Sequence, residues 1–240
     1  MPTIKTQGIV LRTADYRDND RMLTLLTPRG RMDVLSRGCR KNKSPLLAAS
    51  ECFAFGEYVL YQAKGRSTVS SCTLNDAFYP LREDYDKLKY AAYMLALCDA
   101  AAYPELPGAD MFTLLIRSLT RIAYQDMDPR AVTAAFLLFL SVILGYRPQT
   151  DTCLVCGKEI RETPCLFDPV NGGLVCREHP IPPGAVMHPI AGNETAWIRD
   201  VITRGIEKTA FPAEDAPFAI LKTYIETQMD KRIPAGRRLD

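Results

Sequence analysis

The 240-residue chain has little of what most enzymes use for catalysis. It holds only two histidines, His179 and His188, and a single tryptophan, Trp197. It contains no G-x-S-x-G nucleophile motif, no Walker-type phosphate loop and no H-E-x-x-H zinc helix. These absences argue against serine hydrolases, P-loop nucleotide hydrolases and zinc metalloproteases. We therefore expect a protein that is not an enzyme.

Long apolar runs are also missing. The longest, Ala131–Leu144, is too short to span a bilayer as a helix. Residues Met1–Gln7 contain no apolar core of a signal peptide, so we expect no secretory leader and no membrane association. The chain does have eight cysteines, but outside one cluster they are scattered. Free thiols with a metal site, in a reducing cytoplasm, are therefore expected rather than disulfides.

Positive charge is concentrated in the first third of the chain. Residues 1–80 carry 12 lysines and arginines against 7 acidic residues, whereas the net charge of the whole chain is only +2. Such a local excess attracts polyanions by releasing their counterions. The alternative is a solvated surface with a chance imbalance of charge.

The same first 80 residues have the pattern of a small all-β module. Alternating apolar residues between turn signals predict five strands, Ile4–Arg12, Arg21–Thr27, Arg31–Arg37, Cys52–Gln62 and Ser67–Asp76. Pro28-Arg-Gly30 is typical of a tight turn, and a long basic loop covers residues 38–45. Five short strands with a hairpin and longer loops predict a Greek-key barrel of the OB-fold type.

Basic and aromatic residues are interleaved in this module, as in barrels that bind single-stranded nucleic acid. The phosphate-binding candidates are Arg12, Arg37, Arg40, Lys41, Lys43, Lys64 and Arg66, and the basic loop is the strongest of them. The aromatic residues are Tyr16, Phe53, Phe55, Tyr58 and Tyr61. For Phe53 and Phe55 we favour a place in the barrel interior over a role in base stacking.

Helical patterns replace the strands after Pro80. Apolar spacing predicts helices over Tyr85–Tyr103 and Ala109–Gln125, and a third, nearly all-apolar helix that begins at Asp128-Pro129 and ends at Gly145. The acidic run Arg82–Asp86 is better explained as a helix N-cap than as a metal site. Two more helices are expected over Glu194–Thr209 and Pro217–Arg232, followed by a frayed tail from Pro234.

Two short knuckles lie between these helices. Cys153-x2-Cys156 and Cys176-x2-His179, which are separated by nineteen residues, have the spacing of a structural zinc site. Four protein ligands leave no open position, so such a zinc supports architecture and not catalysis. The alternative is four unrelated buried side chains. Cys165 or His188 is an alternative fourth ligand in place of His179.

Three segments together resemble the RecO family of bacterial recombination mediators. They are TQGIVLRTADYRDNDRMLTLLTPRGRMDVLSRGCRKNKSPL from Thr6, CFAFGEYVLYQAKGRSTVSSCTLNDAFYPLREDYDKL from Cys52, and LGYRPQTDTCLVCGKE…FDPVNGGLVC from Leu144. The likeness runs from about Thr6 to Cys176, with only general helical similarity beyond it. His179 stands where the family pattern often has a fourth cysteine.

The resemblance implies a multidomain α+β protein. It implies an OB-fold at 1–80, a helical domain at 81–150 and 183–240, and a zinc-knuckle insertion at 151–182. It also implies binding of single- and double-stranded DNA, strand annealing, and help for RecA loading on gaps coated by SSB, together with RecR, in the RecF pathway. A cytoplasmic, nucleoid-associated bacterial protein is expected.

The resemblance further implies a site for the C-terminal tail of SSB, which is acidic and ends in an apolar residue. Such a peptide requires an apolar pocket rimmed by cations. Arg117, Arg121 and Arg130, around the join of the second and third predicted helices, are the candidates. The alternative is that they pair with Asp126 and Asp128 or are solvated.

Two other functions compete with this interpretation. One is a zinc-containing scaffold or regulator whose β-module binds only protein partners. The other is a metal-dependent hydrolase that uses the knuckle cluster, which would require an open position on the metal.

Overall fold

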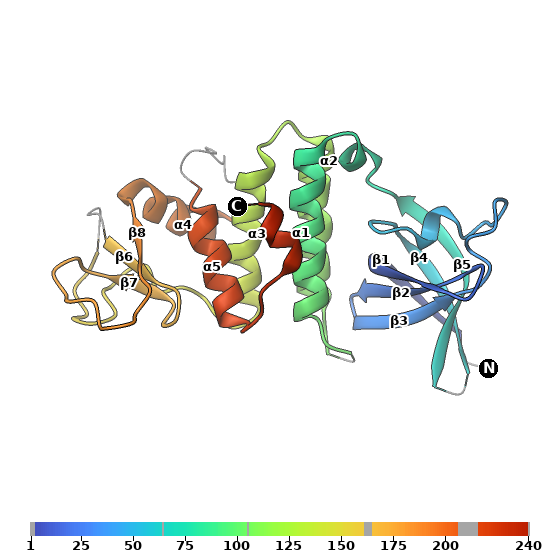
Figure 1. The fold of residues 1–240 in the computed structure, drawn as a ribbon, viewed down its shortest axis with the longest axis horizontal. Helices are drawn as coiled ribbons and strands as arrows, with labels where there is room; N and C mark the ends of the chain where they lie inside the picture. The colour runs from blue at the N-terminus through green and yellow to red at the C-terminus, as the bar shows by residue number, and fades with distance from the viewer. Residues whose placement is uncertain (1–2, 64, 105, 161–164, 206–215, 240) are drawn as a thin grey trace. The chain divides into compact units, whose positions relative to one another are not determined.

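A computed structural model describes residues 3–63, 65–104, 106–160, 165–205 and 216–239. The chain forms two compact units, Met1–Tyr124 and Gln125–Asp240. Among the described residues, the first holds a barrel and two α-helices, and the second holds three α-helices and a small sheet (Figure 1). Within the described residues, every helix is too short or too polar to cross a membrane.

Five strands form the barrel of the first unit. They are β1 (Thr3–Tyr16), β2 (Asp20–Thr27), β3 (Gly30–Ser36), β4 (Phe55–Ala63) and β5 (Arg66–Asp76). The barrel is closed in the order β1-β2-β3-β5-β4, and its one parallel pairing joins β3 to β5 at Val34–Ser67 and Leu35–Thr68. This closed five-stranded barrel confirms the predicted OB-like fold.

The long strand β1 pairs with two neighbours in turn. Its first half, Thr3–Ile9, pairs with β4, and its second half, Ile9–Tyr16, pairs with β2. The register shifts between Val10 and Arg12, where a bulge lets the strand bend around the barrel. Alternate residues point inward, so the barrel core is filled by side chains that include Val10, Leu23, Leu25, Val34, Tyr58 and Leu60.

The predicted strand Cys52–Gln62 begins three residues late, at Phe55. Phe53 lies in a turn with a φ of 71°, and its N–H donates to the Val10 carbonyl at 3.0 Å. A left-handed residue cannot continue a strand. The Phe53 side chain is buried, but it does not belong to the cluster that fills the barrel, and the Arg82 guanidinium lies 5.8 Å from the centre of its ring.

Helices α1 (Tyr85–Ala101) and α2 (Ala109–Tyr124) complete the first unit. Asp84 caps α1, because its carboxylate accepts hydrogen bonds from the N–H groups of Asp86 and Lys87. The acidic run therefore serves as an N-cap, as predicted. The connection between the two helices packs on the β2–β3 turn: the N–H of Gly108 donates to the Pro28 carbonyl at 3.2 Å.

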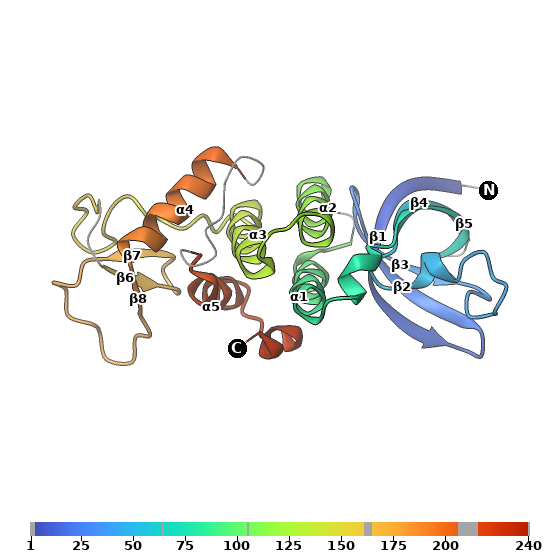
Figure 2. The same cartoon turned by 90° about the horizontal axis from the view of Figure 1, so that it is seen from above.

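The second unit is built on α3 (Pro129–Ile143), which is capped by Asp128 and mostly buried. It packs against α4 (Gly192–Arg204) and α5 (Phe218–Gln228), and Figures 1 and 2 show α5 running beside it. Helix α5 ends four residues before the predicted Arg232, since Asp230 has a φ of 49°. Helix α4 ends at Arg204, earlier than the predicted Thr209, because Gly205 has a φ of 78°; residues 206–209 lie outside the described residues.

The sequence predicts a frayed tail from Pro234, and this prediction is wrong. Residues Pro234–Arg238 form a 3-10 helix. Ile233, directly before it, is buried and anchors the segment. The remaining strands, β6 (Cys165–Asp168), β7 (Gly173–Val175) and β8 (His188–Ile190), form an antiparallel sheet in the order β7-β6-β8.

Candidate metal centre and nucleic-acid interface

Two tight turns of the second unit carry the knuckle residues. In the first turn, the Gly157 N–H donates to the Cys153 carbonyl at 3.0 Å, and Gly157 has a φ of 71°. In the second, which follows β7, the His179 N–H donates to the Cys176 carbonyl at 3.2 Å. A two-residue gap within each turn places both of its ligand side chains on the same side.

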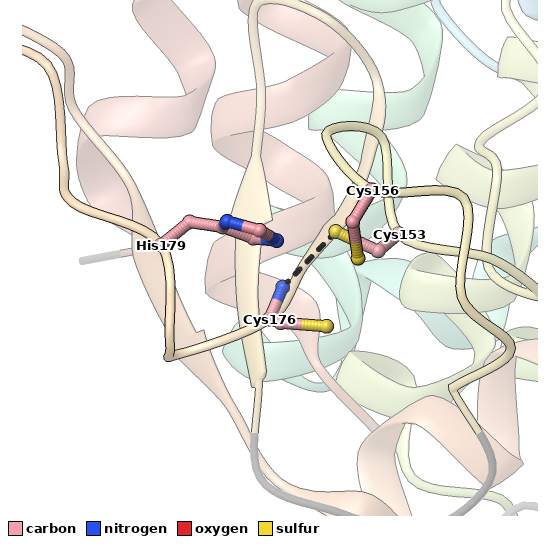
Figure 3. Close-up of side chains that lie close together, drawn as sticks. All are labelled: Cys153, Cys156, Cys176 and His179. Atoms are coloured by element: carbon pink, nitrogen blue, oxygen red, sulfur yellow. Dashed lines mark hydrogen bonds between the residues drawn. The ribbon is translucent and has the colours of Figure 1, made fainter.

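The turns bring four donor atoms together. One ligand atom each from Cys153, Cys156, Cys176 and His179 lies within 4.8 Å of all the others, and Figure 3 shows the four side chains converging. His179 Nε2 is buried, with no hydrogen-bond partner among the described residues. A buried ring nitrogen that faces three sulfur atoms is an arrangement that could hold a metal ion.

Backbone hydrogen bonds lower the pKa of one thiol of the cluster, that of Cys153. The N–H groups of Val155 and Cys176 each lie 3.4 Å from Cys153 Sγ. Burial raises the pKa of the Cys153 thiol, but hydrogen bonds from the backbone of Cys156, Cys176 and Val155 outweigh it and lower the pKa to about 6. Metal ligation requires a thiolate, so this environment favours a cation in the cluster.

The pKa of the thiol in the second turn shifts in the opposite direction. Burial, together with the neighbouring Cys153 and Cys156, raises the pKa of Cys176 to about 11. Adjacent thiolates repel one another, so a bound cation would be needed for all three to ionise together. Three sulfur atoms and one imidazole nitrogen can thus hold one metal ion.

The two alternative ligands lie elsewhere. Cys165 is on β6, where it pairs with Ile190, and His188 is on β8, where it pairs with Phe167. Burial raises the pKa of Cys165, which favours a neutral thiol. Neither residue belongs to the metal-ligating group found among the described residues.

Two side chains that sequence reasoning missed fasten the segment that carries the knuckles to the helices. Arg199, on α4, donates from its guanidinium to the carbonyls of Thr150 and Ile160, which flank the first knuckle. Tyr224, on α5, donates to the Tyr146 carbonyl at 2.5 Å, and its ring lies edge-on to Phe167 at 5.3 Å. Both contacts span long sequence separations, so no local pattern signals them.

The basic loop of the barrel is exposed but held in place. Arg37, Arg40, Lys41 and Lys43 are all exposed. The Arg40 N–H donates to the Asn19 carbonyl at 3.1 Å, and the Gly38 N–H donates to an Asp20 carboxylate oxygen at 2.7 Å. The loop is therefore fixed against the β1–β2 turn.

The other basic candidates are more dispersed. Arg12, on β1, lies 3.5 Å from an Asp99 carboxylate oxygen, so part of its charge is used within the protein. Arg66 is exposed at the start of β5. Lys64 lies outside the described residues.

The aromatic residues of the barrel differ sharply in exposure. Tyr58 is fully buried, and its hydroxyl donates to the Ala49 carbonyl at 2.8 Å. Phe55 is half-buried and packs edge-on against Phe112 of α2 at 6.0 Å, so the expected place in the barrel interior is wrong for this residue. Tyr61 is half-buried, whereas Tyr16 is 36% exposed.

The three arginines proposed to bind a partner fall in different units. Arg117 and Arg121, exposed and half-buried respectively, are on α2 of the first unit. Arg130 is exposed on α3 of the second unit, with its guanidinium 5.9 Å from the centre of the Phe218 ring. The Asp128 carboxylate accepts from the Arg130 backbone N–H at 2.6 Å, as the cap of α3.

Comparison with known proteins matches both parts of the chain to one family. Residues 1–78 match the family described as Recombination protein O N terminal, and residues 82–233 match Recombination protein O C terminal. A DNA repair protein RecO from Alkaliphilus metalliredigens is 32% identical over 176 residues, which cover 73% of this chain and 71% of that protein.

Other relatives carry the same name. The one from Desulfitobacterium hafniense is 34% identical over 74% of this chain, although the match spans only 65% of that protein's length. The one from Desulforamulus reducens is 28% identical over 100% of this chain and 95% of its own length.

Proposed function

The chain belongs to the RecO family of DNA repair proteins, and on that basis we propose that it is a recombination mediator that binds DNA through its barrel. The observation that carries this proposal is the exposed cationic loop, Arg37–Lys43, fixed on a closed OB-like barrel. Barrels of this kind bind single strands by a cationic groove combined with aromatic stacking.

Arg37, Arg40, Lys41, Lys43 and Arg66 are proposed to contact phosphates, with Lys64 and Arg12 as further members of the set. Because phosphate contacts carry no sequence information, binding is expected to be largely independent of sequence. Both single and double strands would be bound, which is what strand annealing requires.

The Cys153, Cys156, Cys176 and His179 cluster is proposed to bind one structural zinc ion. When bound, the metal would cross-link the two turns and leave no open coordination position. The hydrolase alternative needs such a position, so the same four ligands argue against it. We propose that the protein has no catalytic activity of its own.

The proposed partners follow from the family. RecR would act with the protein, RecA would be loaded on gaps coated by SSB, and the acidic C-terminal tail of SSB would bind at arginines of the helices. Arg117, Arg121 and Arg130 remain candidates for that contact, to be tested separately because they belong to different units.

The proposed location is the bacterial cytoplasm, at the nucleoid. The proposed domains are an OB-fold at 1–80, a helical domain at 81–150 and 183–240, and a zinc-knuckle insertion at 151–182.

An electrophoretic titration tests the proposal. Single-stranded and duplex oligonucleotides of equal length are titrated with the full-length protein at several salt concentrations, with and without SSB. Affinity should fall steeply as salt rises. No affinity for either DNA form at low salt would instead favour the scaffold that binds only protein partners.

A further inference from the structure

One exposed aromatic side chain lies at the same end of the barrel as the basic loop. Tyr16 closes the β1–β2 hairpin opposite Asp20, and Asp20 also holds the Gly38 N–H at the start of the loop. The hairpin turn holds the loop a second time, through the Asn19 carbonyl and the Arg40 N–H. These two hydrogen bonds therefore hold the hairpin that carries Tyr16 against the loop that carries the proposed phosphate-binding residues.

The side chains of the other four aromatic residues in this set are buried or half-buried. Tyr58 is fully buried, Phe53 is 6% exposed, and Phe55 packs against Phe112. Tyr61 is half-buried, on β4 opposite Thr68 of β5. Tyr16 is 36% exposed, so its ring is the most accessible of the five.

Charge around Tyr16 suits a polyanion. Residues 15–21 and 37–43 together contain six cations and three carboxylates. Asp15 pairs with Arg21 at 3.2 Å and with Arg40 at 3.3 Å, and Arg21 also pairs with Glu51 at 2.5 Å. These pairs leave four cations, Arg17, Arg37, Lys41 and Lys43, against Asp18 and Asp20. The field at this end is therefore positive next to an exposed ring.

The hairpin turn also places a cation on the ring itself. Arg17 adopts a φ of 56°, and its guanidinium carbon lies 5.2 Å from the centre of the Tyr16 ring. A left-handed backbone is costly for arginine and persists only where the surroundings enforce it. The guanidinium lies over one face of the ring, so a base would stack on the opposite face, next to a cation that suits the phosphate of the same nucleotide.

We infer that Tyr16 is a base-stacking residue that favours single-stranded over double-stranded DNA, with Arg17 at the adjoining phosphate. This inference rests on the proposed function and adds a contact to the base, which the phosphate-binding loop alone does not provide. Paired bases in a duplex are already stacked on each other, so only an unpaired base can stack on the ring.

Variants of Tyr16 separate stacking from charge. Tyr16→Leu should weaken binding of an oligothymidylate by about tenfold, and Tyr16→Phe should bind as the wild type does. Neither change removes a charge, so the dependence of affinity on salt should keep its slope. Affinity of Tyr16→Leu for a duplex of equal length should not change. Thermal unfolding of each variant controls for folding.

A tryptophan at this position reports the contact directly. Wild-type protein has a single tryptophan, Trp197, which is 5% exposed and supplies the background emission. In Tyr16→Trp, the added fluorescence should be quenched by oligothymidylate and not by an abasic sugar-phosphate oligomer of the same length.

The outcomes distinguish the two proposals. If wild-type protein binds single strands but Tyr16→Leu binds as tightly, or the Tyr16→Trp signal responds equally to the abasic oligomer, the stacking inference is overturned and the proposed function stands. If the wild type binds no DNA, both fail.

Discussion

Arg12 on β1 and Asp99 on α1 form an ion pair, with Arg12 Nε 3.5 Å from Asp99 Oδ2. The same carboxylate lies 3.2 Å from Arg31 Nη1 through its other oxygen, so one acidic side chain serves two barrel arginines. Arg31 also donates to the Asp99 carbonyl at 3.2 Å. Asp99 therefore joins the barrel to α1 and offsets positive charge that the sequence had suggested was available for DNA.

The first prediction concerns that carboxylate. Asp99→Asn should raise affinity for single-stranded DNA at low salt, because Arg12 loses its anionic neighbour. It should also lower the free energy of unfolding by up to about 1 kcal/mol, since the half-buried Arg31 loses one of its two carboxylate neighbours and keeps Asp33. Salt-dependent binding and urea unfolding measure the two effects. Arg12→Ala is the control: its side chain is 60% exposed, so its own effect on stability should be small.

The second prediction concerns the basic loop. Replacing Arg40, Lys41 and Lys43 together by alanine should weaken binding to all DNA sequences alike. The slope of log affinity against log salt should flatten by roughly 0.7 for each single-strand phosphate that the variant no longer neutralises. Lys158→Ala, an exposed lysine beside the first knuckle, is the matched control. An unchanged slope in a folded triple variant would place the DNA path elsewhere.

The third prediction concerns the metal. Cys153→Ser should release the metal and lower the melting temperature, because binding energy at a structural site contributes directly to folding. Cys165→Ser removes a buried thiol on β6, outside the cluster, and should retain the metal. Elemental analysis of the freshly purified proteins measures the metal content of both variants. Metal-free wild-type protein, or equal metal loss in the two variants, would refute the assignment.

The fourth prediction concerns the contact between the β2–β3 turn and the α1–α2 connection. Gly30 has a φ of 106°, and a Cβ there would clash with the carbonyl oxygens of Leu106 and Tyr103. Gly30→Ala should therefore destabilise the first unit by more than about 1 kcal/mol. Gly65 also has a positive φ but a Cβ there meets nothing within 4 Å, so Gly65→Ala should destabilise less than Gly30→Ala. Equal unfolding midpoints of Gly30→Ala and Gly65→Ala would contradict this prediction.

The fifth prediction concerns the acidic tail of SSB. Arg121→Ala and Arg130→Ala, made separately, should each weaken binding of a tail peptide in calorimetry if their helices supply the cationic rim. Arg204→Ala, on an exposed arginine that pairs with Asp200, is the control and should bind normally. DNA binding should survive in all three. Unchanged peptide affinity in both test variants would move the site to other residues.

Local signals in the sequence were enough to predict most elements. Asp84 and Asp128 lie one residue before α1 and α3 and cap them, as the sequence pattern indicates. Strands β1 to β5 follow from alternating apolar residues and turn signals, and their number and order are typical of an OB-like barrel. The knuckle spacing also predicts which four residues converge, because each pair of ligands belongs to one turn.

Tertiary structure alone decided the rest, because the deciding contacts join residues that are distant along the chain. Asp99 reaches Arg12 and Arg31 only after α1 packs on the barrel. Arg199 and Tyr224 reach residues on either side of the first knuckle from helices that follow it. The sequence by itself determined where cations and aromatic rings are found. Only the fold determined that Tyr58 is buried and Tyr16 is exposed, since exposure depends on which strands close around a side chain.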